Sequence, residues 1–216
     1  MNKLLEQVKN NIYTYDLIED KDIIVIGLSG GPDSIFLIHA LSALKPVIEK
    51  EKGIFTALDM MEILQNSPRN YHLCVAGSGS ALEEAKLYAA RKNLCNVEFA
   101  GYLTGDRKKE ILQQADVYVS PTTHGEGLPC ALLEAMGTGQ LIVTRSVGGI
   151  KDFFEQNRMG FATESFSPQV FAEAIENLCS DRQKMDAISQ YNRAYAAEHF
   201  CASKTAEKIQ NMVTAE

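Results

Sequence analysis

The sequence predicts an α/β fold, namely a Rossmann-like parallel sheet with helices on both faces and a helical C-terminal tail. Short apolar runs alternate with longer helical patterns from Tyr71 onward. This alternation is typical of parallel strands joined by right-handed crossovers. After Pro168 only helical patterns follow. The length of 216 residues is sufficient for one large domain of this class.

The N-terminal part of the chain predicts three helices and one buried strand. A helix is expected over Asn2–Leu17, and the apolar run Ile23–Leu28 is expected to form a strand. Asp33 can cap a second helix that ends near Leu44. A third helix is expected over Gly53–Leu64.

From residue 71 strands and helices alternate, and the tail is helical. The expected strands are Tyr71–Ala76, Val97–Ala100, Val117–Ser120 and Leu141–Thr144. The expected helices are Ala81–Lys92, Arg107–Gln114, one after Ser120, Gln169–Leu178, Arg182–Glu198 and Ser203–Val213. The last helix has an apolar stripe, which can either fold back on the N-terminal helix or drive formation of a homodimer.

Composition narrows the class of protein. The formal net charge of −7 argues against nucleic acid as a partner, because a nucleic-acid footprint needs a basic face. No apolar run approaches the ~20 residues of a transmembrane segment, and the charged N-terminus has no signal-peptide core. The five scattered cysteines predict reduced, mostly buried thiols and no metal site. We therefore expect a cytoplasmic protein.

Two carboxylates, Glu126 and Glu134, stand eight residues apart in the run Glu126–Met136. Both are expected in or at the start of a helix, where eight steps of ~100° bring them within about 80° of each other. They can then line a crevice at the carboxyl ends of the strands, where open α/β sheets bind ligands. Carboxylates accept hydrogen bonds from hydroxyls, and helix starts bind phosphate oxygens. The run therefore predicts a site for a sugar nucleotide.

This run resembles the Glu-x7-Glu signature of retaining glycosyltransferases of the GT-B fold. Flanking segments that agree with the family are Val75–Gly79, Val97–Tyr102, Ser120–Pro121, Gly137–Thr144 and Val147–Ile150. The resemblance runs from about Glu51 to about Phe200, most of the chain. It implies the nucleotide-sugar-binding half of an enzyme that transfers a sugar from a nucleotide diphosphate donor with retention of anomeric configuration.

The resemblance also implies roles for single residues. Glu126 would face the donor sugar hydroxyls as the catalytic position, and Glu134 would hold the ribose hydroxyls. The other implied donor-binding residues are Lys52 at the diphosphate, Gly101, Tyr102 and Leu103 at the nucleobase, and Gly127, Leu128 and Pro129 beside the sugar and diphosphate. The alternative for Glu126 and Glu134 is that both are solvated helix glutamates. The alternatives for the other segments are that Lys52 is simply exposed to solvent and that residues 101–103 form a turn with only a structural role.

A second phosphate motif follows the first expected strand. Two glycines after a strand let backbone N–H groups turn inward as an anion nest, here formed by Ser29, Gly30, Gly31, Asp33 and Ser34. The run Ile26–Ser34 resembles the PP-loop of ATP pyrophosphatases. Its nearest likeness is the N-terminus of tRNA(Ile)-lysidine synthetase, over about Lys3–Leu44, which implies ATP as a ligand. The alternative is a turn kept for shape, without ATP chemistry.

The two resemblances meet near residue 50, so the chain looks chimeric. We expect a single Rossmann-like domain over residues 1–216, in which residues 1–50 supply a strand that residues 51–216 lack. A missing central strand would leave backbone groups on its neighbours unpaired.

The expected function is donor binding for glycosyl transfer. The acceptor domain of the GT-B family is missing, so we expect weak binding and little or no transfer by this chain alone. Whether the chain by itself is an enzyme stays open. The alternatives are a PP-loop ATP-binding ligase similar to lysidine synthetase and a folded chimeric module without a ligand.

Overall fold

The structure is a computed structural model that describes residues 3–14, 40, 53–122, 127–204, 206 and 210–211. The chain divides into two compact units, Met1–Gly53 and Ile54–Glu216. In the first unit, helix α1 (Lys3–Thr14) lies within the first expected helix. The expected strand Ile23–Leu28 lies outside the described residues, as does the following helix apart from Ala40.

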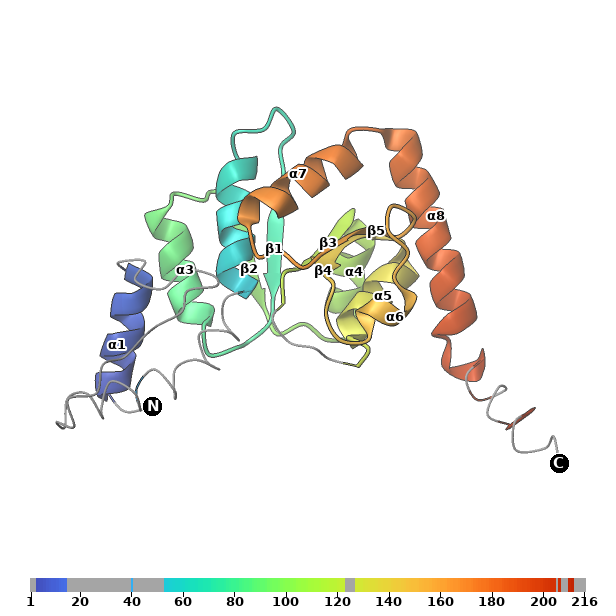
Figure 1. Cartoon of the computed structure of the whole chain (residues 1–216), viewed down its shortest axis with the longest axis horizontal. Coiled ribbons are helices and arrows are strands. Elements are labelled where there is room, and N and C mark those ends of the chain that lie inside the picture. Colours follow the sequence, from blue (N-terminus) through green and yellow to red (C-terminus); the bar gives the residue numbers. More distant parts are fainter. Residues whose placement is uncertain are drawn as a thin grey trace. The chain divides into compact units, whose positions relative to one another are not determined.

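The second unit alternates strands and helices in the expected order (Figure 1). A helix at residues 53–64 precedes β1 (Leu73–Ala76), α3 (Leu82–Arg91), β2 (Val97–Gly101), α4 (Gly105–Gln114) and β3 (Val117–Ser120). Then follow α5 (Cys130–Thr138), β4 (Leu141–Arg145), α6 (Ile150–Phe153), β5 (Gly160–Thr163), α7 (Pro168–Cys179) and α8 (Arg182–His199). The predicted α/β class is therefore confirmed.

All paired strands among the described residues run parallel. β1 pairs with β2, with Leu73 opposite Val97. β4 lies between β3 and β5, with Val117 opposite Leu141 and Ile142 opposite Gly160. Parallel pairing places the carboxyl ends of each set of strands at one edge, which is where α/β folds bind ligands.

Strand β5 and the short helix α6 are not predicted by the sequence. The β5 sequence, Gly-Phe-Ala-Thr, lacks the run of β-branched residues that marks a strand. Its position depends on a close approach to β4, because a Cβ on Gly160 (φ +140°) would overlap the backbone of Ile142. Only glycine adopts this conformation and fits this space. Pairing with β4 therefore defines β5.

The core of the second unit forms around β4. All five residues of β4 are buried, as expected for a central parallel strand covered on both faces. One hydrophobic cluster joins Leu132, Ala135 and Met136 of α5 to Ile142 of β4, Ile150, Met159 and Ala196. On α7, Phe171, Ala172, Ala174, Ile175 and Leu178 are also buried. The β4–α5 pair is thus the best-buried part of the unit and positions the loops at its carboxyl end.

The helix at residues 53–64 is tied to α3 by polar contacts. The Tyr88 hydroxyl donates a hydrogen bond to Asp59 at 2.7 Å, and burial together with this bond raises the pKa of Tyr88 to about 12. The Lys92 ammonium pairs with Asp59 at 3.0 Å and with Glu62 at 2.6 Å. Burial lowers the pKa of Lys92, but the hydrogen bonds with Glu62 and Asp59 outweigh it and leave the pKa raised. Lys92 therefore stays charged at neutral pH.

Candidate functional site

Helix α5 starts at Cys130, directly after its N-cap residue Pro129. A proline disfavours helical conformation in the residue before it, and Pro129 itself is extended (φ −67°, ψ 112°). Glu126, which lies outside the described residues, is therefore four positions before the helix. Helix α5 contains Glu134 but begins four residues after Glu126, so the helical spacing expected for the two carboxylates does not apply within α5.

The first turn of α5 has no side-chain cap. Pro129 has no side-chain acceptor, while its carbonyl accepts hydrogen bonds from the amides of Leu132 (3.0 Å) and Leu133 (3.2 Å). The amides of Cys130 and Ala131 precede these and point out of the helix start. Such groups, together with the positive end of the helix dipole, favour an anion such as a phosphate.

Glu134 lies on α5 and pairs with Lys108 in the first turns of α4. The Lys108 ammonium lies 2.7 Å from one carboxylate oxygen and 2.6 Å from the other. Both side chains are partly exposed, at 39% for Lys108 and 42% for Glu134. The sequence does not identify Lys108 as a site residue, because a lysine in an exposed helix carries no signal until its partner from another helix is known.

The predicted nucleobase loop directly precedes α4. Gly101 ends β2 in a left-handed conformation (φ +70°), which favours glycine. Tyr102 follows with 77% of its surface exposed, and Leu103 precedes the α4 N-cap residue Thr104. The ion pair with Lys108 therefore brings Glu134 to the helix that begins at this loop. Two of the predicted donor-binding segments are thus on neighbouring elements.

The backbone of Gly127 lies against the turn before α6. A Cβ on Gly149 would overlap the carbonyl oxygen of Gly127, so only glycine allows this approach. Gly127 is exposed, and Leu128 has 49% of its surface exposed. The predicted residues Gly127, Leu128 and Pro129 are therefore accessible at the start of α5.

Several predicted site residues are not placed. Lys52 and Glu126 lie outside the described part of the chain. The same holds for the second phosphate motif with Ser29, Gly30, Gly31, Asp33 and Ser34. Their roles stay predictions.

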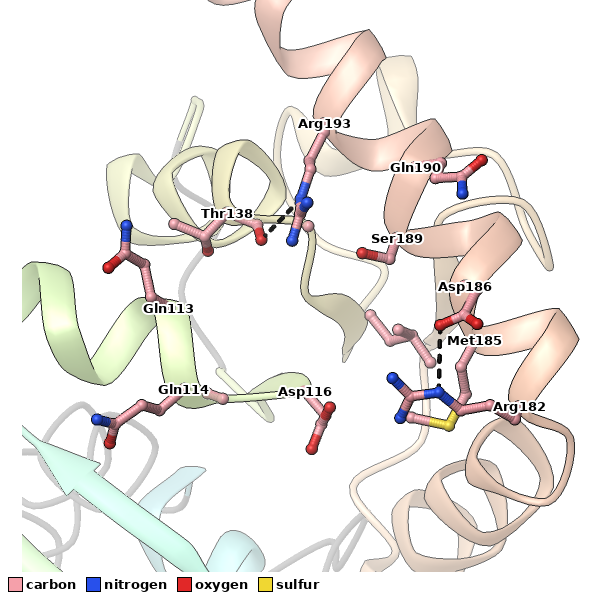
Figure 2. A pocket seen from close by; sticks show the side chains of 13 residues that line it. Gln113, Gln114, Asp116, Thr138, Arg182, Met185, Asp186, Ser189, Gln190 and Arg193 are labelled. Carbon is pink, nitrogen blue, oxygen red and sulfur yellow. Dashed lines mark hydrogen bonds and ion pairs between the residues drawn. The ribbon is translucent and has the colours of Figure 1, made fainter.

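Two cavities lie at the opposite, amino ends of the strands. The first, of about 260 Å³, is lined by the end of α4, the end of α5, the starts of β3 and β4, and one face of α8. Figure 2 shows Arg193 reaching the carbonyl oxygen of Thr138 (3.1 Å) and Arg182 paired with Asp186 (3.2 Å). The second, of about 530 Å³, adjoins Tyr71 before β1 and Asn96 before β2. Neither contains a predicted donor-binding residue, so the candidate site stays at the carboxyl ends.

Comparison with known proteins decides the family. Residues 41–195 match the model of the family described as glycosyl transferases group 1. The chain belongs to this family. The range matched by the glycosyltransferase family includes every predicted donor-binding residue and Glu126, whereas the second phosphate motif precedes it.

Curated relatives of this glycosyltransferase chain are longer proteins. It is 27% identical over 147 residues to a D-inositol 3-phosphate glycosyltransferase of Corynebacterium urealyticum, covering 66% of this chain and 34% of the relative. It is 29% identical over 133 residues to an uncharacterised glycosyltransferase of Methanocaldococcus jannaschii, covering 61% and 33%. The chain spans about one third of the length of these relatives.

Solved structures show the same fold. HepE of Anabaena, in complex with UDP and glucose, superposes with a TM-score of 0.67 at 21% identity, covering 76% of this chain and 45% of HepE. The C-terminal domain of the group 1 protein LpcC from Francisella tularensis superposes with a TM-score of 0.60 at 19% identity, covering 71% of this chain and 81% of that domain. The glycosyltransferase chain therefore matches less than half of HepE and most of the isolated LpcC domain.

The cysteines of this glycosyltransferase chain are free thiols, but they are not mostly buried as expected. Four are exposed and Cys179 is half-buried, because they lie at helix ends, in loops and on the open face of β1. Among the described residues, no three His, Cys, Asp or Glu side chains gather as metal ligands. Within the same residues, no helix has the length and apolar character needed to cross a membrane.

Proposed function

We propose that this chain is the donor-binding half of a retaining glycosyltransferase, with a nucleotide diphosphate sugar as its ligand. The observation that carries the proposal is the placement of Glu134. Its carboxylate lies beside α4, which begins at the predicted nucleobase loop, and on α5, whose start has no side-chain cap. One ligand with a ribose between a base and a diphosphate fits this order of groups.

The proposed contacts follow the chemistry of such a ligand. Ribose hydroxyls donate to Glu134, and diphosphate oxygens accept from the amides of Cys130 and Ala131. The backbone of Gly101, Tyr102 and Leu103 contacts the base, while Glu126 faces the sugar and Lys52 the diphosphate. Crystal structures of HepE contain UDP with glucose and UDP-glucose, which favours a uridine diphosphate sugar here.

Transfer is proposed to need a second, acceptor-binding domain. Holding two reactants in position contributes about 7–11 kcal/mol to such reactions, and the donor half provides only part of the cleft. We therefore expect donor binding to be weak and transfer by this chain alone to be negligible. The cytoplasmic location, the homodimer and the chimeric origin with its PP-loop stay predictions.

Calorimetric titration with UDP, GDP and ATP tests the proposal. UDP is expected to bind, and Glu134→Ala is expected to weaken UDP binding about tenfold or more, because a charged hydrogen bond contributes about 1.5–3 kcal/mol. The matched control is Glu173→Ala, which removes an exposed glutamate from α7 and is expected to leave UDP affinity unchanged.

Two other outcomes of the titration would contradict the proposal, and a third would change only the nucleobase. Binding of ATP that Glu134→Ala does not affect moves the site to Ser29–Ser34 and the ligase similar to lysidine synthetase. Absence of binding for all three nucleotides leaves a folded module without a ligand. Tighter binding of GDP than of UDP keeps the donor site and changes the base.

A further inference from the structure

Two consecutive residues at the end of β4 bind carbonyl groups where the chain leaves β3. The Thr144 hydroxyl donates to the Ser120 carbonyl oxygen at 3.1 Å. The Arg145 guanidinium donates through Nη1 to the Thr122 carbonyl oxygen at 3.1 Å. Thr144 is fully buried, and only 9% of Arg145 is exposed. The first residues after β3 are therefore held by the neighbouring strand.

The guanidinium of Arg145 has further partners that fix its plane. Nη2 donates to the Glu164 carbonyl oxygen at 2.7 Å, and the group lies 3.4 Å from the centroid of the Phe166 ring. A planar guanidinium that stacks on a ring and binds two carbonyl groups has one orientation. Burying a cation is costly, and an apolar side chain of similar volume often stabilises a fold as well. The property that arginine adds here is a fixed orientation of its guanidinium towards the carbonyl groups of Thr122 and Glu164.

The other end of the same connection is also fixed by the segment after β4. Gly127, just before α5, packs its carbonyl oxygen where a side chain on Gly149 would otherwise lie. Gly149 is the N-cap residue of α6, four residues after Arg145. Of the described ends of the connection from β3 to α5, Thr122 is therefore held by a hydrogen bond from Arg145 and Gly127 packs closely against Gly149.

We infer that Arg145 is a positioning residue for the sugar end of the donor site. It acts through Thr122 on the connection to Gly127, which the proposed function places beside the sugar and diphosphate. The ribose end is positioned separately, by the pairing of Lys108 with Glu134 between α4 and α5. This inference rests on the proposed function, and it predicts that changing Arg145 separates recognition of the sugar from recognition of the nucleotide.

The test compares UDP-glucose with UDP in Arg145→Met and in the more conservative Arg145→Lys. We expect the affinity for UDP-glucose to fall about tenfold in Arg145→Met, whereas the affinity for UDP falls less than about threefold. Arg145→Lys should lie between wild type and Arg145→Met, because an ammonium lacks the planar fork that binds both carbonyl groups. Arg193→Met is the matched control, since Arg193 also donates to a backbone carbonyl, at the opposite end of α5.

A second measurement needs no ligand. Amide hydrogen exchange in the ligand-free protein should become faster in the peptide covering residues 121–131 of both Arg145 variants, and not in the Arg193→Met control. Equal losses of UDP and UDP-glucose affinity would overturn the inference, as would unchanged exchange in this peptide. If the wild-type protein binds neither nucleotide, the proposed function fails and the donor-site role of Arg145 fails with it. Faster exchange would then show only that Arg145 holds this connection.

Discussion

At the scale of single residues, Glu134 pairs with Lys108. We expect this ion pair to contribute less to ligand binding than the carboxylate of Glu134 itself. An ion pair between partly exposed side chains contributes about 0–1 kcal/mol, because water screens it. A carboxylate also has about four lone-pair sites and can bind an ammonium and a hydroxyl together. The pair with Lys108 therefore orients Glu134 without blocking it.

Lys108→Ala should consequently change UDP affinity by less than about fivefold, which corresponds to the ~1 kcal/mol of an exposed pair. Glu134→Ala should have the larger effect, since it removes the hydroxyl acceptor itself. Calorimetric titration of both variants with UDP checks this order. A loss in Lys108→Ala as large as that in Glu134→Ala would mean that the lysine, and not the carboxylate, contacts the ligand.

Glu176 on α7 makes the stability of the folded state depend on pH in the acid range. Its carboxylate accepts hydrogen bonds from Arg69 at 2.7 Å and from the Tyr71 hydroxyl at 3.2 Å. Hydrogen bonds from Ser67, Tyr71 and Arg69 lower the pKa of Glu176 below its ordinary value of 4.5. Because the folded state lowers this pKa, the stabilisation is present above pH 4.5 and is lost as pH falls through the lowered value.

Glu176→Gln should therefore reduce the loss of stability between about pH 6 and about pH 3. At pH 6 the variant should be less stable than wild type, and the difference should shrink towards pH 3. Urea unfolding at a series of pH values measures this. The exposed control Glu173→Gln should follow wild type, and parallel curves for Glu176→Gln and wild type would contradict the assignment.

At the scale of elements, one buried amide joins α8 to two strands. The Asn192 side chain is fully buried and donates to the carbonyl oxygens of Gln140 (2.8 Å) and Met159 (2.9 Å). These residues immediately precede β4 and β5. Asn192 thus donates to backbone carbonyl groups just before both strands. The Met159 carbonyl also accepts from the amide of Ile142 in β4 at 3.1 Å.

Asn192→Ala should lower the free energy of unfolding by about 1–3 kcal/mol, because the Gln140 carbonyl loses this buried donor. The Met159 carbonyl keeps its hydrogen bond from Ile142. Urea denaturation followed by circular dichroism measures the change. Gln190→Ala, which alters an exposed residue of the same helix, should change stability by less than about 0.5 kcal/mol. Similar small effects for both variants would show that α8 docks by apolar packing alone.

Local sequence patterns predicted the long helices and most strands, including the four-residue β3, but not strand β5 or helix α6. Helix α7 carries its own start signal, since Pro168 occupies its first turn. Helix α8 does so through Asp181, whose carboxylate accepts from the amides of Gln183 and Lys184. Strand β5 carries no such signal, because its position depends on how closely Gly160 approaches β4. The start of α5 was misjudged because the effect of Pro129 on the preceding residues outweighed the apparent helical spacing.

At the scale of the whole molecule, the strand pairing indicates that one strand position of the sheet is not occupied by any described residue. β1–β2 and β3–β4–β5 correspond to strands 2–3 and 4–5–6 of the doubly wound order 3-2-1-4-5-6. Among the described residues no strand precedes the helix at 53–64, so the position of strand 1, between β1 and β3, has no described occupant. The strand expected over Ile23–Leu28 lies outside the described residues, so its insertion at this position stays a prediction.

Deletion of residues 1–50 should then abolish cooperative unfolding, because β1 and β3 would each keep an edge of unpaired backbone groups. Deletion of residues 1–14 removes α1 but keeps Ile23–Leu28, and should preserve the cooperative transition. Urea unfolding combined with light scattering measures both variants. A cooperatively folded monomer of residues 51–216 would contradict the prediction and would also remove the need for a strand from the N-terminal segment.

The sequence by itself determined the α/β class, the order of the long elements and the family of residues 41–195, because these depend on periodicity and on motifs that are local along the chain. Only the tertiary structure decided that Lys108 pairs with Glu134, that Arg145 binds Thr122 and that Gly149 makes room for Gly127. Each of these contacts joins residues that are distant in sequence, and the packing of neighbouring strands and helices brings them together.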